Sequence, residues 1–257
     1  MERDVALKGL VLREENIGEG DKIITLLTGE KGRITVSCKG ARSLKSKRFY
    51  AVQLFTFSDL VIGESKGRYF LKEAEVIESF VGIRESLEAI SLAAYIAEVA
   101  SAVTVEEQNE SAILSLVLNS FYMLSKKGAE ISLVKSVFET RIAAELGFEP
   151  ILDSCSVCGK DKGEFYLDLT GGVLMCSECV FGGNTGECGG AEGRLVYLDS
   201  ALLELFGYIM RCPPKKIFSF KSDKVTLDAL AELSESYLLA HVERGFSTLD
   251  FLKKLIY

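Results

Sequence analysis

The sequence is poor in several residue types on which enzymes depend. Its 257 residues include one histidine, His241, three prolines and no tryptophan. Histidine is the usual general base near neutral pH, so a single copy leaves few catalytic mechanisms open. The sequence also holds no G-x-x-x-x-G-K-[ST] phosphate-binding loop and no G-x-G-x-x-G fingerprint. These absences favour a binding protein over an enzyme.

Long apolar runs are missing as well. The longest candidate, Leu92–Val103, is interrupted by Glu98, so the sequence predicts no transmembrane helix. The first residues are charged and lead into no apolar segment, so no signal peptide is expected and the protein is predicted to be cytoplasmic. With 48% hydrophobic and 26% charged residues, the composition is that of a globular protein and not of a disordered chain.

Four of the seven cysteines form two close pairs in the pattern C-x2-C-x17-C-x2-C. Each C-x2-C turn brings two thiolates to one ion, and two such turns complete a tetrahedral zinc site. Four thiolates leave no open ligand position, so the pattern predicts one structural Zn²⁺ ion; an iron ion or four free buried thiols are the alternatives. The predicted ligands are Cys155, Cys158, Cys176 and Cys179. The other cysteines, Cys38, Cys188 and Cys212, are expected to take no part.

Charge is unevenly distributed along the chain. The net charge is −7, yet the first 80 residues are net positive, and the stretch from Lys31 to Arg48 holds seven basic residues and no acidic one. Such a run is either a solvated loop or an electrostatic surface for nucleic-acid phosphates. The candidate nucleic-acid contacts are Lys31, Arg33, Lys39, Arg42, Lys45, Lys47 and Arg48. Of these, Lys39 and Arg42 are expected to contribute most.

The first 80 residues have the pattern of a small β-barrel. In the run Arg33–Lys39, the residues Ile34, Val36 and Cys38 alternate with polar and basic ones, which predicts a half-buried strand with a basic outer face. Five strands with a long connection after the third fit a barrel of the OB type, although five short strands alone are also compatible with an SH3-like barrel. The predicted strands are Val5–Arg13, Lys22–Thr28, Arg33–Lys39, Gln53–Ile62 and Arg68–Ser79.

From residue 83 the apolar period becomes helical. Helices are predicted over Ile83–Val103, Ser111–Lys126 and Ile131–Leu146, and again after the cysteines, where Asp199 or Ser200, Asp223 and Ser247 open further helices. The predicted fold is therefore α+β and multidomain. It has an N-terminal five-stranded OB-type barrel, an α-helical body and a four-cysteine zinc segment inserted between helices. The predicted domains are a barrel over 1–80, helical parts over 81–150 and 196–257, and the zinc segment over 151–195.

Two short motifs match catalytic signatures by their letters alone. Gly63–Gly67 reads G-x-S-x-G, but a nucleophile elbow joins a strand to a helix, and here a second strand follows. A hairpin turn is the better interpretation. His241-Val242-Glu243 resembles part of a zinc-deaminase motif, but the cysteines precede it instead of following it. We expect His241 to be a partly packed helix residue.

Several stretches together resemble the bacterial recombination mediator family RecO. They are Gly18–Lys22 leading into Ile23–Thr28, Lys39–Arg42, Glu75–Phe80, and Glu145–Pro150 just before the cysteines. The resemblance covers nearly the whole chain. Not all members of that family keep the four cysteines, so their presence implies a zinc-binding member.

The resemblance implies a DNA repair protein without an active site, associated with the nucleoid. Such a protein binds single- and double-stranded DNA and anneals complementary strands. With the partner RecR it assists the loading of RecA onto gapped DNA coated by single-stranded-DNA-binding protein, and it contacts the acidic C-terminal tail of that coating protein. Phe49 or Tyr50 would offer a base-stacking surface on the barrel, but both are expected to lie in the core.

Two other classes of function stay open. One is a zinc-ribbon interaction or transcription module whose barrel binds protein and not DNA. The other is a metalloenzyme. Within the family interpretation, Arg141 is a candidate receptor for the acidic tail, although an ion pair inside its own domain is the expected role.

Overall fold

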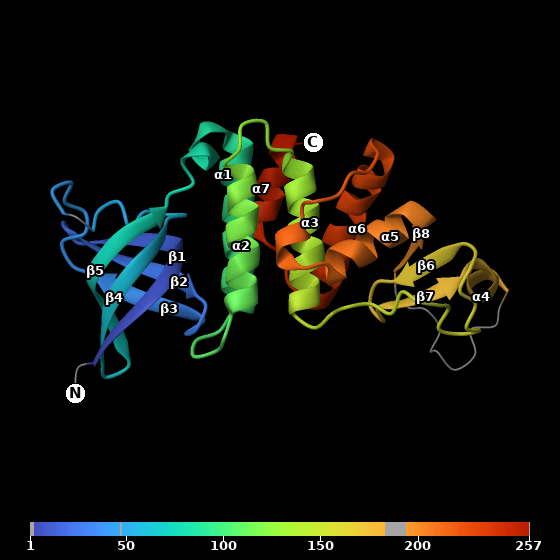
Figure 1. The fold of residues 1–257 in the computed structure, drawn as a ribbon, viewed down its shortest axis with the longest axis horizontal. Coiled ribbons are helices and arrows are strands. Elements are labelled where there is room, and N and C mark those ends of the chain that lie inside the picture. Colours follow the sequence, from blue (N-terminus) through green and yellow to red (C-terminus); the bar gives the residue numbers. More distant parts are fainter. Residues whose placement is uncertain (1–2, 47, 183–193, 257) are drawn as a thin grey trace. The chain divides into compact units, whose positions relative to one another are not determined.

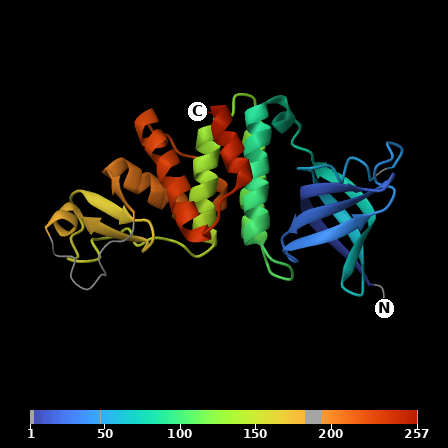
Figure 2. The same ribbon diagram turned by 180° about the vertical axis from the view of Figure 1, so that it is seen from behind.

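The computed structural model describes residues 3–46, 48–182 and 194–256. The chain divides into two compact units: unit 1 comprises Met1–Ile131 and Phe246–Tyr257, and unit 2 comprises Ser132–Gly245 (Figures 1 and 2). Among the described residues, no helix is long and apolar enough to cross a membrane.

Unit 1 begins with a closed five-stranded barrel (Figure 1). Its strands are β1 (Arg3–Ile17), β2 (Asp21–Thr28), β3 (Arg33–Cys38), β4 (Phe57–Ser65) and β5 (Arg68–Glu78). They are hydrogen-bonded in the order β1-β2-β3-β5-β4, and β1 also pairs with β4, which closes the barrel. The pairing of β3 with β5 is parallel, and the other pairings are antiparallel. This order confirms the OB-type barrel over the SH3-like one.

The alternation predicted for the third strand is confirmed. Ile34, Val36 and Cys38 are buried in the barrel core, whereas Arg33 lies on the exposed face. Burial raises the pKa of the Cys38 thiol to about 12, so this cysteine stays protonated and inert, as expected.

Two strand boundaries differ from the prediction by four residues, and the others by three or fewer. The first strand continues to Ile17, and the fourth begins at Phe57 and not at Gln53. Residues 53–56, which were predicted to begin the fourth strand, form a turn. In it the Thr56 amide donates to the Gln53 carbonyl, and Phe55 adopts a φ of 64°. A backbone in this left-handed region cannot continue a strand.

The G-x-S-x-G motif is a hairpin turn, as predicted. Lys66 and Gly67 join β4 to β5 with φ values of 52° and 71°. Positive φ at both central residues is the signature of the two-residue turn that matches strand twist. The motif is therefore not a nucleophile elbow.

The barrel is followed by η1 (Val81–Glu85) and the helices α1 (Leu87–Val103) and α2 (Ser111–Leu124), and the chain ends with α7 (Ser247–Ile256). The predicted first helix is thus split, with a short 3-10 turn before Ser86. Figure 2 shows α1 and α7 side by side. Glu98 of α1 accepts hydrogen bonds from both the amide and the hydroxyl of Thr248. The charged residue that interrupts the apolar run of α1 thereby caps the first turn of α7.

The β2–β3 turn is hydrogen-bonded to the α1–α2 loop within unit 1. The Arg33 amide donates to the Val105 carbonyl at 3.1 Å, and the Glu107 amide donates to the Lys31 carbonyl at 3.0 Å. Gly32 lies between them with a φ of 62°, and a Cβ there would lie 1.9 Å from the Val105 oxygen. Only glycine fits this approach.

Unit 2 places the cysteine segment between helices, as predicted. It contains α3 (Ile131–Glu145), β6 (Phe165–Asp168), β7 (Val173–Cys176), α4 (Ser177–Phe181), β8 (Leu195–Leu198), α5 (Ser200–Arg211), η2 (Pro214–Lys216) and α6 (Lys224–Val242). The three strands form a sheet in the order β7-β6-β8. Asp199 accepts from the Leu202 amide at 2.8 Å, and Asp223 from the Thr226 amide at 3.0 Å, so both predicted caps are confirmed.

Candidate metal centre and nucleic-acid interface

The four clustered cysteines come from two short motifs that the sheet of unit 2 brings together. Cys155 and Cys158 lie on a turn closed by the Gly159 amide, which donates to the Cys155 carbonyl at 2.9 Å. Cys176 ends β7, and the chain turns at once into α4, which carries Cys179. Gly159 has a φ of 72°, which lets the chain reverse directly after the second thiol.

The geometry fits a four-coordinate metal ion. All four Sγ atoms lie within 4.8 Å of one another, and the Sγ atoms of Cys158 and Cys176 are 3.7 Å apart. In a tetrahedral site with metal–sulfur bonds of about 2.3 Å, neighbouring sulfur atoms are about 3.8 Å apart. Three of the four cysteines are buried and Cys158 is exposed, so the cluster lies at the edge of the segment.

Backbone donors favour the thiolate form at the centre of this cluster. The Cys176 amide donates to the Cys155 sulfur at 3.3 Å. Burial on its own raises the pKa of Cys155, but the amide donors around its sulfur outweigh it and lower the pKa to about 6. Burial and the neighbouring thiols raise the pKa of Cys179. A cluster of thiols whose pKa values are shifted in opposite directions keeps some of its protons without a metal and releases them when a metal binds.

Lys160 is a cation near the cluster that the sequence pattern did not identify. Its Nζ lies 2.7 Å from a Glu178 oxygen, and this hydrogen bond is the main reason that the pKa of Lys160 is raised. The charges of Cys176 and Cys158 raise it further. The lysine thus offsets part of the negative charge that four thiolates bring to one ion. Its position two residues after Cys158 is the only signal for this role in the sequence.

The basic connection (residues 39–56), which joins β3 to β4, is a chain of hydrogen-bonded turns. Amides of Ser43, Ser46 and Phe49 donate to the carbonyls of Gly40, Ser43 and Ser46, respectively, so every third residue closes a turn. At its two ends Ala41 and Val52 are completely buried. The connection is therefore held against the barrel, although its described residues form neither helix nor strand.

Two arginines of the basic connection are anchored to neighbouring barrel elements. Arg42 donates from its guanidinium to the Gly18 carbonyl at 2.7 Å, and its amide donates to the Gly20 carbonyl at 3.1 Å. Arg48 donates to the Leu71 carbonyl at 3.3 Å. Because carbonyls are uncharged, both guanidinium groups keep their full positive charge. Arg33, on the exposed face of β3, likewise donates to the Thr104 carbonyl at 3.2 Å.

Lys39 and Lys45 are the most freely presented cations of the run. Both are exposed, and no ion-pair partner within the described parts of the chain contacts either of them. Their charges are thus available to an outside ligand. Lys47, the remaining candidate on the connection, lies outside the described residues.

Lys31 lies in a different electrostatic environment. Its Nζ is 3.0 Å from a Glu107 oxygen and 3.9 Å from a Glu64 oxygen, and Tyr69 lies within hydrogen-bond range. The hydrogen bond to Glu107 is the main reason that the pKa of Lys31 is raised. Since the side chain is only 21% exposed and paired, its charge is largely neutralised within unit 1.

The expectation that both aromatic residues of the connection lie in the core was wrong for Tyr50. Tyr50 is 64% exposed, whereas Phe49 is half-buried and packs edge-on against it, with ring centroids 5.1 Å apart. Leu44, on the same connection, is 75% exposed. The connection follows turns and not a strand, so no alternation along its sequence indicates which of its side chains are buried.

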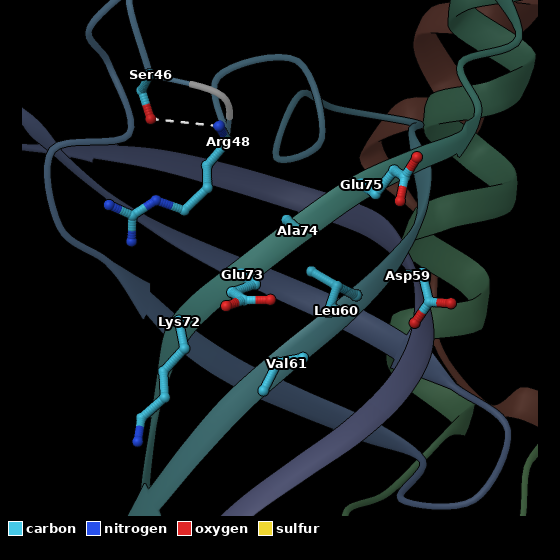
Figure 3. Close-up of a pocket in the computed structure, with 9 residues that line it drawn as sticks. All are labelled: Ser46, Arg48, Asp59, Leu60, Val61, Lys72, Glu73, Ala74 and Glu75. Atoms are coloured by element: carbon cyan, nitrogen blue, oxygen red, sulfur yellow. Dashed lines mark hydrogen bonds between the residues drawn. The ribbon is translucent and has the colours of Figure 1, made fainter.

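A hollow of about 740 Å³ lies beside the basic connection, bordered by β4 and β5 (Figure 3). Arg48 and Ser46 stand at one side, and the exposed carboxylates of Asp59, Glu73 and Glu75 at the other. These acidic side chains make the β4–β5 face unfavourable for phosphates. Lys72 of β5 is the second cation in this lining, and its ammonium is paired with Asp4 at 2.6 Å.

Two further sequence-based expectations are confirmed in unit 2. Arg141 pairs with Glu145 at 2.7 Å and donates to carbonyls at the C-terminal end of α5, including those of Met210 and Cys212 at 2.8 Å each. Arg141 therefore forms an ion pair inside its own domain, as expected. His241 packs against Tyr237 and is half-buried. Cys212 is buried and distant in sequence from the cluster, and Cys188 lies outside the described residues.

The whole chain matches one family. Residues 1–80 match the model "Recombination protein O N terminal", and residues 84–250 match "Recombination protein O C terminal". The "DNA repair protein RecO" of Acetivibrio thermocellus is 34% identical over 96% of this chain and 95% of its own length. Proteins of the same name from Caldanaerobacter subterraneus subsp. tengcongensis and Pelotomaculum thermopropionicum are 28% and 30% identical, over 98% and 95% of this chain and 99% and 92% of their own lengths. The chain belongs to the RecO family of DNA repair proteins.

Proposed function

We propose that this protein acts in DNA repair by binding DNA, without catalysing a reaction itself. The observation that carries the proposal is the acid-free run Lys31–Arg48, whose cations are displayed on β3 and on a hydrogen-bonded connection of the barrel. Both single- and double-stranded DNA present phosphates to such a surface. The barrel, residues 1–80, is thus the DNA-binding domain.

Within the run, the proposed contacts differ in strength. Lys39, Arg42 and Lys45 form the centre of the surface, because they are exposed and carry uncompensated charge. Arg33, Lys47 and Arg48 extend it on either side. Lys31 contributes least, since Glu107 is its partner.

We further propose that the protein anneals complementary strands and, together with RecR, assists RecA loading onto gapped DNA covered by single-stranded-DNA-binding protein. Cations that neutralise phosphates on two strands lower the repulsion between them, which is the physical requirement for annealing. The helical segments over 81–150 and 196–257, on an acidic part of the chain, serve protein partners. Association with DNA places the protein at the nucleoid in the cytoplasm.

The acidic tail of the single-stranded-DNA-binding protein needs a receptor other than Arg141, whose guanidinium is engaged. A hollow of about 610 Å³ beside α5 is the site we propose for it. Its apolar lining includes Leu203 and Tyr208, and Lys216 borders it. Arg211 borders it too but is paired with Glu149 at 2.5 Å, and Glu204 adds one carboxylate to the lining. An apolar floor with the Lys216 ammonium at the rim suits a peptide of acidic and apolar residues. Lys216→Glu is expected to weaken binding of a tail peptide in a direct titration without changing DNA affinity.

We propose Zn²⁺ as the ion held by Cys155, Cys158, Cys176 and Cys179. A closed set of four thiolates is the typical donor set of a structural zinc, and it leaves no position at which water would be activated. One ion bound there would hold the turn of the first pair, the end of β7 and α4 together. The segment over 151–195 is accordingly a structural zinc domain.

The experiment that tests the DNA-binding proposal is fluorescence anisotropy of a labelled single strand over a salt series. It compares the native protein with Lys39→Glu/Arg42→Glu. On single strands each phosphate contact contributes a slope of about −0.7 in log K against log salt, so loss of two contacts makes the slope shallower by about 1.4. If the variant binds like the native protein, the barrel surface is not the DNA site. Indifference of this kind would favour a barrel that binds protein.

A further inference from the structure

We propose that the basic connection binds the bases of a nucleic-acid strand as well as its phosphates. The Tyr50 ring stacks on an unpaired base, and the Leu44 side chain inserts against the neighbouring base. This inference rests on the proposed DNA-binding function and adds to it a preference for strands whose bases are exposed. The two residues present apolar surface to solvent, within or directly beside the seven-cation, acid-free run Lys31–Arg48.

Tyr50 is held in place and not merely exposed. Phe49 packs edge-on against its ring at 5.1 Å with an interplanar angle of 89°. Phe49 is itself fixed, because the Gln53 side-chain amide donates to its carbonyl at 2.9 Å and the Lys22 ammonium lies 5.9 Å from its ring centroid. Lys22 is buried and paired with Glu14 at 2.8 Å. An aromatic ring fixed in this way loses little conformational freedom when a base stacks on it.

Leu44 lies between two of the proposed phosphate contacts. It is 75% exposed, with Arg42 two residues before it and Lys45 directly after it. The Ser46 amide donates to the Ser43 carbonyl at 2.8 Å, so Leu44 lies within a closed turn. Apolar side chains at the tip of a cationic segment insert between bases in many DNA-binding proteins, where they unstack neighbouring bases.

The charges near Leu44 and Tyr50 distinguish between possible ligands. A surface that binds an apolar protein partner needs no charged residues around it, but every charged residue from Lys31 to Arg48 is a cation. A strand of nucleic acid offers what both parts of the connection require, since it has phosphates for Arg42 and Lys45 and flat apolar bases for Tyr50. A fully paired duplex offers the phosphates but hides the base faces in its stack.

The test compares two strands of equal length, one an oligothymidine and the other a sugar–phosphate chain of abasic sites, at one salt concentration. The native protein should bind the base-bearing strand more tightly by about 5- to 150-fold, because a base stacked on an aromatic ring contributes about 1–3 kcal/mol. Leu44→Ala/Tyr50→Ala should lose this preference while keeping its affinity for the abasic strand and its salt slope. Tyr50→Phe should keep the preference.

Val225→Ala is the matched control, since Val225 is an aliphatic side chain with 76% exposure at the start of α6 in unit 2. It should leave binding of both strands unchanged. Equal affinity of the native protein for both strands, or a preference that survives Leu44→Ala/Tyr50→Ala, would overturn the inference. Failure of the proposed function would give a different result, because Lys39→Glu/Arg42→Glu would then leave the affinity for both strands unchanged.

Discussion

A buried ion network between α3 and α6 gives the most quantitative prediction for unit 2. The Lys135 ammonium lies 3.0 Å from Glu139 and 2.8 Å from Glu235, and the Ser234 hydroxyl donates to Glu139 at 2.8 Å. The exposed fractions of the three charged side chains are 2%, 0% and 16%. Burial lowers the pKa of Lys135, but the two carboxylates outweigh it and raise the pKa overall. Because the pKa of Lys135 is raised, the lysine is charged near pH 7, and the stability that it contributes is lost only at alkaline pH.

Lys135→Met removes the cation and keeps the volume of the side chain. Glu139 then loses the ammonium of Lys135, and breaking a buried pair in this way costs about 3–5 kcal/mol. That is a large fraction of the roughly 5–15 kcal/mol by which a domain is stable. The double variant Lys135→Met/Glu139→Gln removes the uncompensated charge and should recover at least about half of the loss, because Glu235 at the rim can turn to water.

The cost of Lys135→Met should also depend on pH. Without the cation, burial raises the pKa of the Glu139 carboxyl above its value in the unfolded chain, so the folded variant binds a proton more tightly. Stability of the variant relative to the native protein therefore improves as the pH falls from 7 to 5. Amide hydrogen exchange of α3 and α6 measures this locally, which is preferable in a chain of two compact units. A cost below about 1 kcal/mol at pH 7, or one that is equal at pH 5, would refute the reasoning.

Three further outcomes are expected. Cys155→Ser should reduce bound zinc from one ion per chain to substoichiometric levels in a metal-release assay and should increase proteolysis of the cysteine segment, while DNA affinity at the barrel is retained. Lys31→Met should lower thermal stability, because Glu107 loses its cation and keeps only the hydrogen bond from Tyr69, yet it should weaken DNA binding less than Lys39→Met in the same anisotropy assay. Gly32→Ala should lower the melting temperature more than Gly67→Ala, because both glycines have positive φ but only Gly32 approaches a carbonyl too closely for a Cβ.

The sequence predicted those parts of the fold that depend on local periodicity. Strand β3 was identified correctly because one of its faces is buried and the other exposed, and period-two alternation reports that directly. The beginning of β4 was wrong because the turn at Phe55 is set by its hydrogen bond to the Val11 carbonyl. That partner is distant in sequence, so no local pattern reveals it.

The candidate sites were predictable to different degrees for the same reason. The clustering of the four cysteines was predicted because each C-x2-C turn is a local unit, and a shared metal would require the two units to meet. The role of Lys135 was missed because a Lys–Glu pair at i, i+4 usually lies on a helix surface, and only tertiary packing buries it here. The cations of the basic run were predicted as a group. The ion pair of Lys31 was not predicted, since its partner Glu107 lies in a loop that follows α1.

That pairing limits how strongly the barrel can bind DNA. The acid-free run holds seven basic residues, but the ammonium of Lys31 is balanced by Glu107, whereas Arg42 and Arg48 donate only to neutral carbonyls. At most six cations of this run therefore release counterions, and if the run alone binds a single strand, the slope of log K against log salt should be no steeper than about −4. A steeper slope would require cations outside the run, such as Lys66 or Arg68 of the barrel. Because stacking on Tyr50 releases no counterion, the surface can also gain affinity through bases without becoming more sensitive to salt.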